Sequence, residues 1–262
     1  KATISKDKKV EISKNMSDSL IHRGPDGGGV WVDEKNYCAL SHRRLSILDL
    51  SKNGNQPMIS KSKKFVICYN GEVYNLEFLK KKLKSVNLKL RGHSDTELIL
   101  ECCEHFGIKE TVNSLIGMFA FAIYDVKKEC LFLVRDRVGI KPLFWSITNN
   151  NFLFASEIKA FSFFPSLKRT INKNSVADYL KFGYVPSPAT IYDDIFKLSP
   201  GTILKIDKKF KPKLIKYWSL EKIISKNEKY ISDTKVAENE LEDLLTDSIK
   251  KRMFADVPVG AF

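Results

Sequence analysis

The sequence FVICYNGEVYN places three reactive groups at the end of an apolar run: the side-chain amide of Asn70, the backbone N–H of Gly71 and the carboxylate of Glu72. Two N–H donors aimed at one carbonyl oxygen stabilise the charge that builds on it during acyl transfer, by a few kcal/mol. Glycine suits such a position because it has no Cβ to block a close approach. An Asn-Gly pair between strand-like residues also signals a hairpin turn. Alone, the stretch therefore fits either an oxyanion hole or a turn.

Three other charged stretches lack an evident structural purpose: HRGPDGGG at 22–29, SHRRLSILD at 41–49 and RGHSDTE at 91–97. Arg44 can bind a carboxylate with its planar guanidinium, although beside Asp49 it can also form a surface ion pair. Asp95 can bind a cation or can simply be an acid favoured by a helix dipole. Because a site is a constellation of groups, the four stretches together predict one binding pocket.

The composition is typical of a globular protein, since 43% of the 262 residues are apolar and 29% are charged. No stretch approaches the ~20 apolar residues of a membrane span, and the first residues lack the apolar core of a signal peptide. We therefore expect a cytoplasmic protein without a membrane partner. The formal charge of +13 comes mostly from scattered lysines, with only 8 arginines among 44 basic residues, so we expect no nucleic-acid partner.

The five cysteines show no metal-ligand spacing among themselves or with the four histidines. This distribution predicts reduced, mostly buried thiols and no metal site. The histidines have no Ser or Asp pattern that suggests a catalytic triad, and we interpret them as structural.

Apolar periodicity predicts helices over 9–21, 75–84, 94–107 and 233–254, with Asn75 as the cap of the second and a capping box of Ser94 and Glu97 at the start of the third. Short apolar runs joined by turns predict antiparallel strands over 29–33, 37–42, 65–70, 118–125, 129–136, 142–148, 152–157 and 199–207. The nearly continuous apolar character of several strands indicates burial on both faces, as in two stacked sheets with helices outside. The final run, DVPVGAF, reads as a further buried strand.

These charged stretches, together with RDRVGIKPLFW at 135–145 and FLFASEIKAF at 152–161, occur in a distinctive order. The chain resembles the N-terminal glutaminase domain of the glutamine-dependent asparagine synthetases, which are class II (N-terminal-nucleophile) amidotransferases. The resemblance implies an α+β fold over residues 1–207, a four-layer αββα sandwich of two antiparallel sheets. A linker over 208–234 and the first elements of an α/β ATP-pyrophosphatase domain over 235–262 would follow.

The resemblance also implies a glutamine site with shared roles. Its expected members are Arg44 for the α-carboxylate, Glu72 and Asp95 for the α-ammonium group, Asn70 and Gly71 for the oxyanion, Leu45, Ser46, Ile47 and Leu48 for the wall, and Arg23 as a brace near the nucleophile. Phe262 would approach the nucleotide of the second domain.

The nucleophile of this family is an N-terminal cysteine whose α-amino group acts as the base. Lys1 is not that residue, and no strand precedes residue 9, where the family has one. A missing piece on the order of 5–6 residues plus a turn would explain both absences, so we expect an inactive fragment. Cys68 lies two residues before Asn70, but a cysteine in an apolar strand without a base is usually a core residue.

The resemblance implies that the full-length protein converts aspartate to asparagine with ATP and Mg²⁺, using ammonia from glutamine; a homodimer is one assembly open to it. Three alternatives remain. A related enzyme amidates a sugar acid or other carboxylate in surface-polysaccharide synthesis, and the glucosamine-6-phosphate synthase branch shares the glutaminase fold. The domain can also be a non-catalytic relic, as in β-lactam synthetases.

Overall fold

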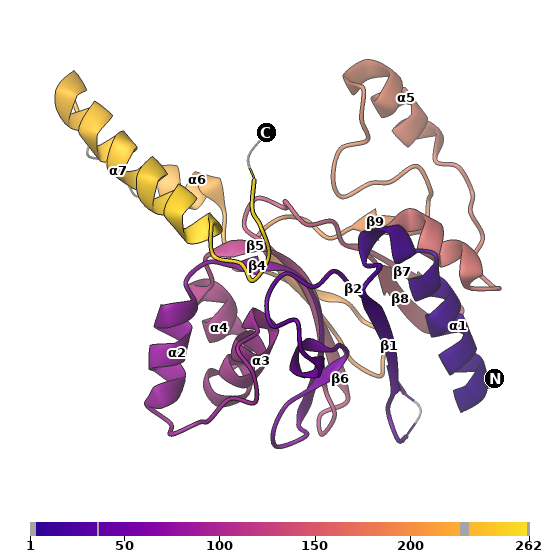
Figure 1. The fold of residues 1–262 in the computed structure, drawn as a ribbon. Helices are drawn as coiled ribbons and strands as arrows, with labels where there is room; N and C mark the ends of the chain where they lie inside the picture. Colours follow the sequence, from indigo (N-terminus) through magenta and orange to yellow (C-terminus); the bar gives the residue numbers. More distant parts are fainter. Residues whose placement is uncertain (1–3, 36, 226–230, 261–262) are drawn as a thin grey trace.

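The chain, described here by a computed structural model over residues 4–35, 37–225 and 231–260, forms three antiparallel sheets (Figure 1). The largest sheet has the strand order β11-β10-β6-β5-β4-β3. Its strands are β3 (Met58–Ile59), β4 (Phe65–Val73), β5 (Gly117–Asp125), β6 (Cys130–Arg135), β10 (Thr202–Ile206) and β11 (Lys213–Lys216). Two smaller sheets pack on one face of it: β1 (Gly27–Val32) with β2 (Ala39–Arg44), and β8 (Asn151–Ala155) with β7 (Phe144–Thr148) and β9 (Ile195–Lys197).

Helices cover the outer faces of both sheet layers. The large sheet is covered by α2 (Leu76–Lys84), α3 (Asp95–Phe106) and α4 (Ile108–Ser114). The small sheets are covered by α1 (Lys6–Asp18) and the 3₁₀ segment η3 (Ile158–Phe163). This order of helices, sheet, sheets and helices confirms the predicted αββα sandwich, with the second layer divided into two sheets within the described ranges.

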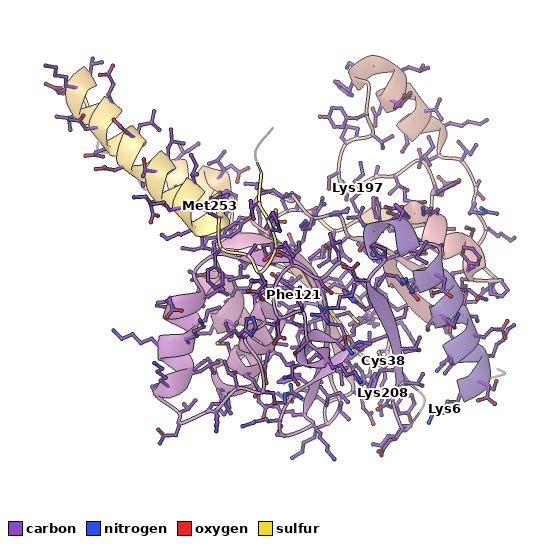
Figure 2. All side chains as sticks on the ribbon, in the orientation of Figure 1. Lys6, Cys38, Phe121, Lys197, Lys208 and Met253 are labelled. Atoms are coloured by element: carbon purple, nitrogen blue, oxygen red, sulfur yellow. The ribbon has the colours of Figure 1, made fainter. Side chains whose placement is uncertain are left out.

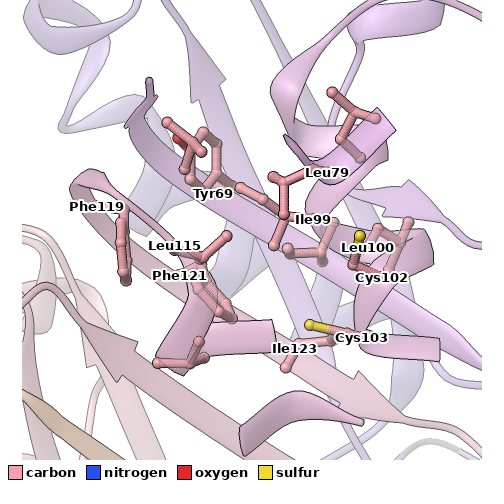
Figure 3. Close-up of a cluster of buried hydrophobic side chains, with 14 of the residues drawn as sticks. Tyr69, Leu79, Ile99, Leu100, Cys102, Cys103, Leu115, Phe119, Phe121 and Ile123 are labelled. Carbon is pink, nitrogen blue, oxygen red and sulfur yellow. The ribbon is translucent and has the colours of Figure 1, made fainter. Parts of the chain in front are cut away.

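Strand β4 is buried on both faces, as its continuous apolar sequence predicted. Phe65, Ile67 and Tyr69 point toward α2 and α3, where Tyr69 and its neighbours form a packed aromatic and aliphatic core (Figure 3). Val66 and Cys68 point the opposite way, into the core between the sheet layers. This alternation places the side chains of the following even-numbered residues, at the tip of the strand, between the two layers.

The Asn-Gly pair of β4 does not form a turn. The strand runs unbroken through Val73, and Gly71 pairs with Phe119 of β5 in register. The hairpin alternative is therefore wrong. The local reason is that residues 65–73 all find partners on β5, so the chain has no need to reverse at Asn70.

The predicted caps are correct in part. Ser94 caps α3 by accepting a hydrogen bond from Glu97 N (3.3 Å), but the Glu97 carboxylate turns to the backbone N–H of Arg91 and Gly92 instead of closing the capping box. Asn75 precedes α2 without capping it, because its amide bonds Ser114 and Ile116 across the loop.

Three helices project from the sandwich: α5 (Lys173–Phe182), α6 (Leu220–Ile224) and α7 (Thr234–Arg252). The end of α7 at Met253 lies beside the body of the molecule, while its start points away (Figures 1 and 2). Across the described ranges, no helix combines the length and the apolar character that crossing a bilayer requires.

The chain after α7 is not the buried strand that DVPVGAF predicted. Its described residues, up to Gly260, form no strand and are largely exposed. A buried strand needs partners for its backbone groups, and among the described residues 254–260 makes one backbone hydrogen bond, from Asp256 N to Ile47 O (3.0 Å). The expected nucleotide contact, Phe262, lies outside the described residues.

The interval predicted as a linker contains ordered elements. β11 pairs with β10 at the edge of the large sheet, and α6 follows it. Residues 226–230 of this interval lie outside the described residues. The division of the chain at 207 and 234 stays a prediction.

Replacing the buried Leu98 by alanine should destabilise the fold strongly. Leu98 lies on α3 with 0% exposure, so Leu98→Ala leaves a cavity and should lower the free energy of unfolding by about 3 kcal/mol. Leu180→Ala, at a position 80% exposed on α5, is the matched control and should change it by less than about 0.5 kcal/mol. Urea denaturation measures both; equal losses would contradict the assigned core.

Candidate functional site

One cavity of about 980 Å³ lies between the two sheet layers, with α1 along one side. It gathers nearly all the predicted site residues, although they come from four separate stretches of the sequence. Those lining it are Arg23, Arg44, Leu45, Ile47, Leu48, Asn70, Gly71, Glu72 and Asp95. Ser46 does not line the cavity; its backbone N–H donates to Asp26 Oδ2 (2.7 Å).

The backbone N–H of Gly71 is open to this cavity because of its place on β4. Successive peptide groups of a strand point to opposite sides. Tyr69 N donates to Gln56 Oε1 (2.6 Å) and Val73 N donates to Asp95 Oδ2 (3.2 Å), both on the side away from β5. The N–H of Gly71, midway between them, points the same way and has no hydrogen-bond partner among the described residues. It is thus available as a donor, next to the Asn70 amide.

Glycine is required at position 71 for a reason that differs from the one predicted. We expected it to let a ligand approach. A Cβ built there would instead lie 2.3 Å from Met118 O and 2.7 Å from the Cα of Phe119 on β5. Tight pairing of the two strands therefore selects glycine, and the open N–H is a consequence of strand alternation.

Two carboxyl groups, those of Glu72 and Asp95, line the cavity, and Lys141 lines it as well. Burial, and after it the nearby Asp95 carboxylate, raise the pKa of Glu72 to about 8, while the charge of Lys141 opposes the shift. Burial also raises the pKa of Asp95 to about 6, against hydrogen bonds from the Tyr69 hydroxyl (2.7 Å) and Val73 N. A bound cation would relieve both the repulsion and part of the desolvation. This pair is suited to an ammonium group.

Arg44 supplies the opposite charge from the last position of β2. Its Nη1 donates to Ser51 O (2.9 Å) and Asn55 Oδ1 (3.0 Å), and its Nη2 donates to the backbone carbonyl of Asp49. Within the described ranges no carboxylate pairs with it, so the surface ion pair considered for Arg44 and Asp49 is wrong. The buried guanidinium keeps its charge unneutralised and its Nε–H without a protein acceptor, as a carboxylate-binding group requires.

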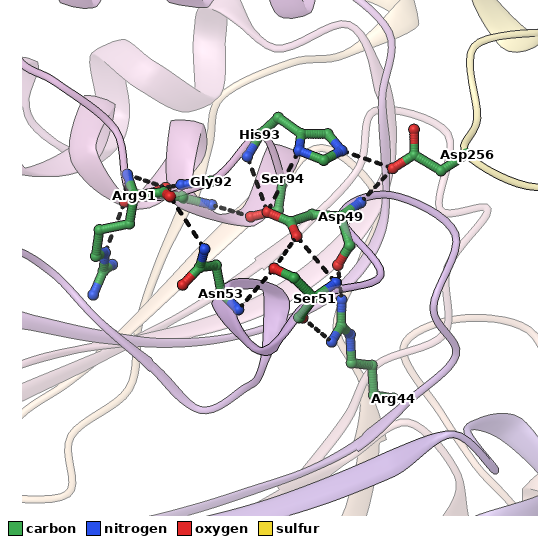
Figure 4. A network of polar contacts seen from close by, with 10 residues as sticks. Arg44, Asp49, Ser51, Asn53, Arg91, Gly92, His93, Ser94 and Asp256 are labelled. Carbon is green, nitrogen blue, oxygen red and sulfur yellow. Dashed lines mark hydrogen bonds and ion pairs between the residues drawn. The ribbon is translucent and has the colours of Figure 1, made fainter.

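Asp49 organises the loops on both sides of Arg44, a role that no sequence pattern indicated. Its Oδ1 accepts from the Ser51 hydroxyl (2.5 Å) and its Oδ2 accepts from His93 N (2.9 Å) (Figure 4). The residue has φ +54°, which Asp tolerates better than most residues. A Cβ on Gly92 would lie 2.1 Å from Oδ2, so glycine permits this approach. Asp49 thereby joins the Arg44 loop to the loop that precedes Asp95.

Gln56 and Lys141, which the sequence analysis did not single out, also line the cavity, beside the predicted Arg23. The Gln56 side chain bonds the backbone of Tyr69 as a neighbouring strand would. Its Oε1 accepts from Tyr69 N, and its Nε2 donates to Tyr69 O (3.2 Å). Arg23, the predicted brace, pairs with Glu157 (2.9 Å), the residue that precedes η3. Burial lowers the pKa of Lys141, while the Glu72 carboxylate opposes this shift. A signal for these residues existed only in the family motifs, because their partners are distant in sequence.

Comparison with known proteins agrees with this geometry. Residues 2–218 match the family described as a glutamine amidotransferase domain. The chain belongs to this family.

Relatives of this amidotransferase domain include larger proteins. The chain is 39% identical to a putative glutamine-hydrolyzing asparagine synthetase 2 of Methanocaldococcus jannaschii, over 97% of this chain and 51% of that relative. It is 33% identical to the glutamine-hydrolyzing asparagine synthetase 3 of Bacillus subtilis, over 94% and 39%. The amidase chry2 of Gibberella zeae is 32% identical, over 97% and 37%. The chain thus spans about half or less of the length of these relatives.

A solved structure extends the likeness to the fold. The glutamine phosphoribosylpyrophosphate amidotransferase of B. subtilis, complexed with ADP and GMP, superposes with a TM-score of 0.59 at 20% identity, over 80% of this chain and 47% of that one. At this identity the likeness concerns the fold alone, which is that of the N-terminal-nucleophile hydrolases, as predicted.

Cys68 of this amidotransferase domain has the features of a core residue. Its Sγ contacts the Ser41 carbonyl at 3.7 Å, and burial raises the pKa of its thiol. A thiol held in the neutral form is a poor nucleophile. All five cysteines are free thiols, and four of them are buried, as the sequence predicted.

Replacing Glu72 by glutamine should stabilise the unliganded domain at high pH. The pKa of Glu72 is raised from 4.5 to about 8 on folding, so the favourable effect of its neutral form is present below pH 4.5 and is lost as pH rises through 8. Glu72→Gln removes this loss. We expect a gain of about 2 kcal/mol in unfolding free energy at pH 9, discounted for partial exposure, and almost none at pH 4.

Urea denaturation at both pH values measures this difference. Glu77→Gln is the control, because the Glu77 carboxylate is exposed and pairs with Lys80 (2.7 Å); it should bring no gain at pH 9. An equal gain for Glu72→Gln at pH 4 and pH 9 would show that ionisation is not the cause.

Proposed function

We propose that the full-length protein hydrolyses glutamine in this cavity and uses the ammonia for ATP-dependent amidation of aspartate to asparagine. The observation that carries the proposal is the distribution of charge around the cavity. A guanidinium without a carboxylate partner in the described ranges, Arg44, and two neighbouring acids, Glu72 and Asp95, line the same space. A free α-amino acid is complementary to that pattern, because it carries one carboxylate and one ammonium group on a single carbon.

Arg44 binds the α-carboxylate through its free N–H groups, and Glu72 with Asp95 binds the α-ammonium group. The ligand's cation lowers the pKa of both acids, so glutamine binding at neutral pH releases protons. Substrates that lack the α-ammonium group leave the acid pair uncompensated, which discriminates against simple amides. The Asn70 amide and the Gly71 N–H then face the side-chain carbonyl oxygen.

The reaction is a thioester-forming amide hydrolysis. A cysteine thiolate attacks the side-chain carbon, and the oxyanion receives hydrogen bonds from Asn70 and Gly71. The thiol proton, held by the α-amino group of the same cysteine, passes to the leaving nitrogen and ammonia departs. Water then cleaves the thioester, so that glutamine and water yield glutamate and ammonia.

Two strand edges without a paired strand among the described residues support the proposal that this cysteine begins a further strand. The Arg44 carbonyl and the other even-numbered residues of β2 form their backbone hydrogen bonds toward β1. Because peptide groups alternate along a strand, those of Ala39, Ser41 and Arg43 point away from β1. Both β2 and β8 line the cavity, between the large sheet and α1. The space is larger than one amino acid needs. A strand between β2 and β8 would satisfy both edges and join the two small sheets into one.

ATP and Mg²⁺ are proposed for the full-length protein, together with a nucleotide contact at Phe262. Among the described residues no group of three or more His, Cys, Asp or Glu side chains is arranged to hold a metal ion. We therefore assign no residue of the described chain to Mg²⁺ or to ATP. A cytoplasmic location and a homodimer remain part of the proposal.

A second candidate concerns the acceptor. The fungal relatives carry the name amidase, not synthetase, which favours considering carboxylates other than aspartate, including sugar acids. The donor cavity is equally suited to either acceptor. The residues that precede Lys1 in the full-length protein separate a working glutaminase, which needs a cysteine there, from a non-catalytic relic.

Substitutions at the two ends of the ligand should abolish glutaminase activity of the full-length protein without unfolding it. Arg44→Ala removes the carboxylate partner, and Asp95→Asn removes a charge while keeping an oxygen for Tyr69 and Val73. Each should lower kcat/KM for glutamine about 100-fold or more, measured as glutamate formed. Arg169→Ala, an exposed arginine, is the control. Near-normal KM and turnover in both variants would contradict the site assignment.

An acceptor screen tests the amidation step. The full-length protein, given glutamine and ATP, should release pyrophosphate with aspartate and form asparagine in equal amount. Sugar acids and other amino-acid carboxylates are the comparison acceptors. Pyrophosphate release with a sugar acid and none with aspartate would favour the second candidate and leave the glutamine site unaffected.

A further inference from the structure

The segment that follows α7 is bound to the walls of the glutamine cavity by one residue. Asp256 donates its backbone N–H to Ile47 O (3.0 Å). Its Oδ2 accepts from Asp49 N (2.8 Å) and contacts His93 Nε2 (2.7 Å) (Figure 4). Three contacts thus converge from two loops that are more than 150 residues away in the sequence.

Both of these loops hold ligand-facing groups. Ile47 and Leu48 line the cavity, and the Asp49 carbonyl accepts from Arg44. On the other loop, His93 lies two residues before Asp95, and its Nδ1 is 3.7 Å from Asp49 Oδ2. The His93 ring therefore lies between the carboxylates of Asp49 and Asp256, where it links the carboxylate-binding side of the cavity to the ammonium-binding side.

A second set of contacts, from the last residue of α7 and from Phe254, reaches the residues that follow β4, the strand that carries Glu72. The Arg252 guanidinium lies 4.6 Å from the ring centroid of Tyr74. Phe254 lines a smaller cavity together with Tyr74 and Leu76. Tyr74 directly follows Val73, whose N–H binds Asp95. The end of α7 and the segment after it thus contact the 47–49 loop and the residues that follow β4.

We propose that Asp256 is a positioning residue for the glutamine cavity, and that glutamine affinity depends on the placement of the segment after α7. The proposal rests on the proposed function of the cavity. When Asp256 is in place, Ile47 and Asp49 are held by paired hydrogen bonds and Arg44 keeps its orientation. When the segment moves away, the loop loses both bonds and the cavity wall loosens. By linkage, bound glutamine favours the docked segment to the same degree.

The size of the effect follows from the exposure of the groups. The side chains of His93 and Asp256 are 57% and 33% exposed, so their ion pair contributes little by itself. The two backbone hydrogen bonds, one of them to a carboxylate, are the stronger part. We expect a change of about tenfold in glutamine affinity, not an on–off effect.

The test compares variants of the full-length protein. Asp256→Ala should raise the KM for glutamine about tenfold with kcat within about twofold, because the loop and not the reacting groups is altered. Asp256→Asn keeps an oxygen for Asp49 N, and its KM should fall between those of the wild type and the alanine variant. Asp243→Ala, at an exposed position of α7, should leave KM unchanged.

Amide hydrogen exchange gives a readout that does not need activity. In Asp256→Ala the N–H of Asp49 should exchange about tenfold faster than in the wild type, while an amide of the remote core, such as Leu98, stays unchanged. Unchanged KM and unchanged exchange at Asp49 would overturn the proposal. If the wild-type protein fails to hydrolyse glutamine but the exchange responds, the proposed function fails and the contact between segment and loop stands.

Discussion

The burial of two acids, Glu72 and Asp95, is the constraint around which this site is built. Burial opposes the ionisation of both carboxyl groups, and the Asp95 carboxylate also opposes that of Glu72. The fold keeps them together through β4, which carries Glu72, and through the Tyr69 hydroxyl and Val73 N–H, which hold Asp95. The burial of these acids lowers the stability of the unliganded domain at neutral pH. Under the proposed function, a ligand with an ammonium group would recover that free energy on binding.

The second constraint is that a charged ligand end must be met by a side chain that cannot move away. Arg44 satisfies it because three acceptors from the 49–55 loop hold its guanidinium. The same loop is fixed in turn by Asp49, whose carboxylate reaches the chain before Asp95. The two ends of the cavity are therefore not independent: a shift of the Asp49 loop displaces the cation-binding and anion-binding groups together.

Much of this arrangement could be predicted from sequence, and the limits have physical causes. The apolar run of β4 and the Ser94 cap are local signals, and both were correct. The family motifs brought Arg44, Glu72 and Asp95 to one cavity, where the structure places them. Asp49 and Gln56 were missed, because their partners are backbone groups far along the chain. The reason for Gly71 was also misjudged, since the crowding by Met118 of β5 appears only once the strands pair.

The strand predicted for DVPVGAF shows the same limit of prediction from sequence. DVPVGAF has the composition of a buried strand, but composition cannot specify a partner, and the described residues form no strand beside it. Asp256, the polar residue at its start, determines how this segment lies, through Ile47, Asp49 and His93.

The strength of that contact decides what kind of device it can be. A switch that converts a site from 1% to 99% competent needs about 5.5 kcal/mol of difference between its two states. Two backbone hydrogen bonds and an exposed ion pair provide about 1–2 kcal/mol. Asp256 can therefore adjust glutamine affinity but cannot silence the site by itself. If glutamine hydrolysis depended completely on a bound acceptor, that dependence would need more contacts with the glutaminase domain than residues 252–256 make.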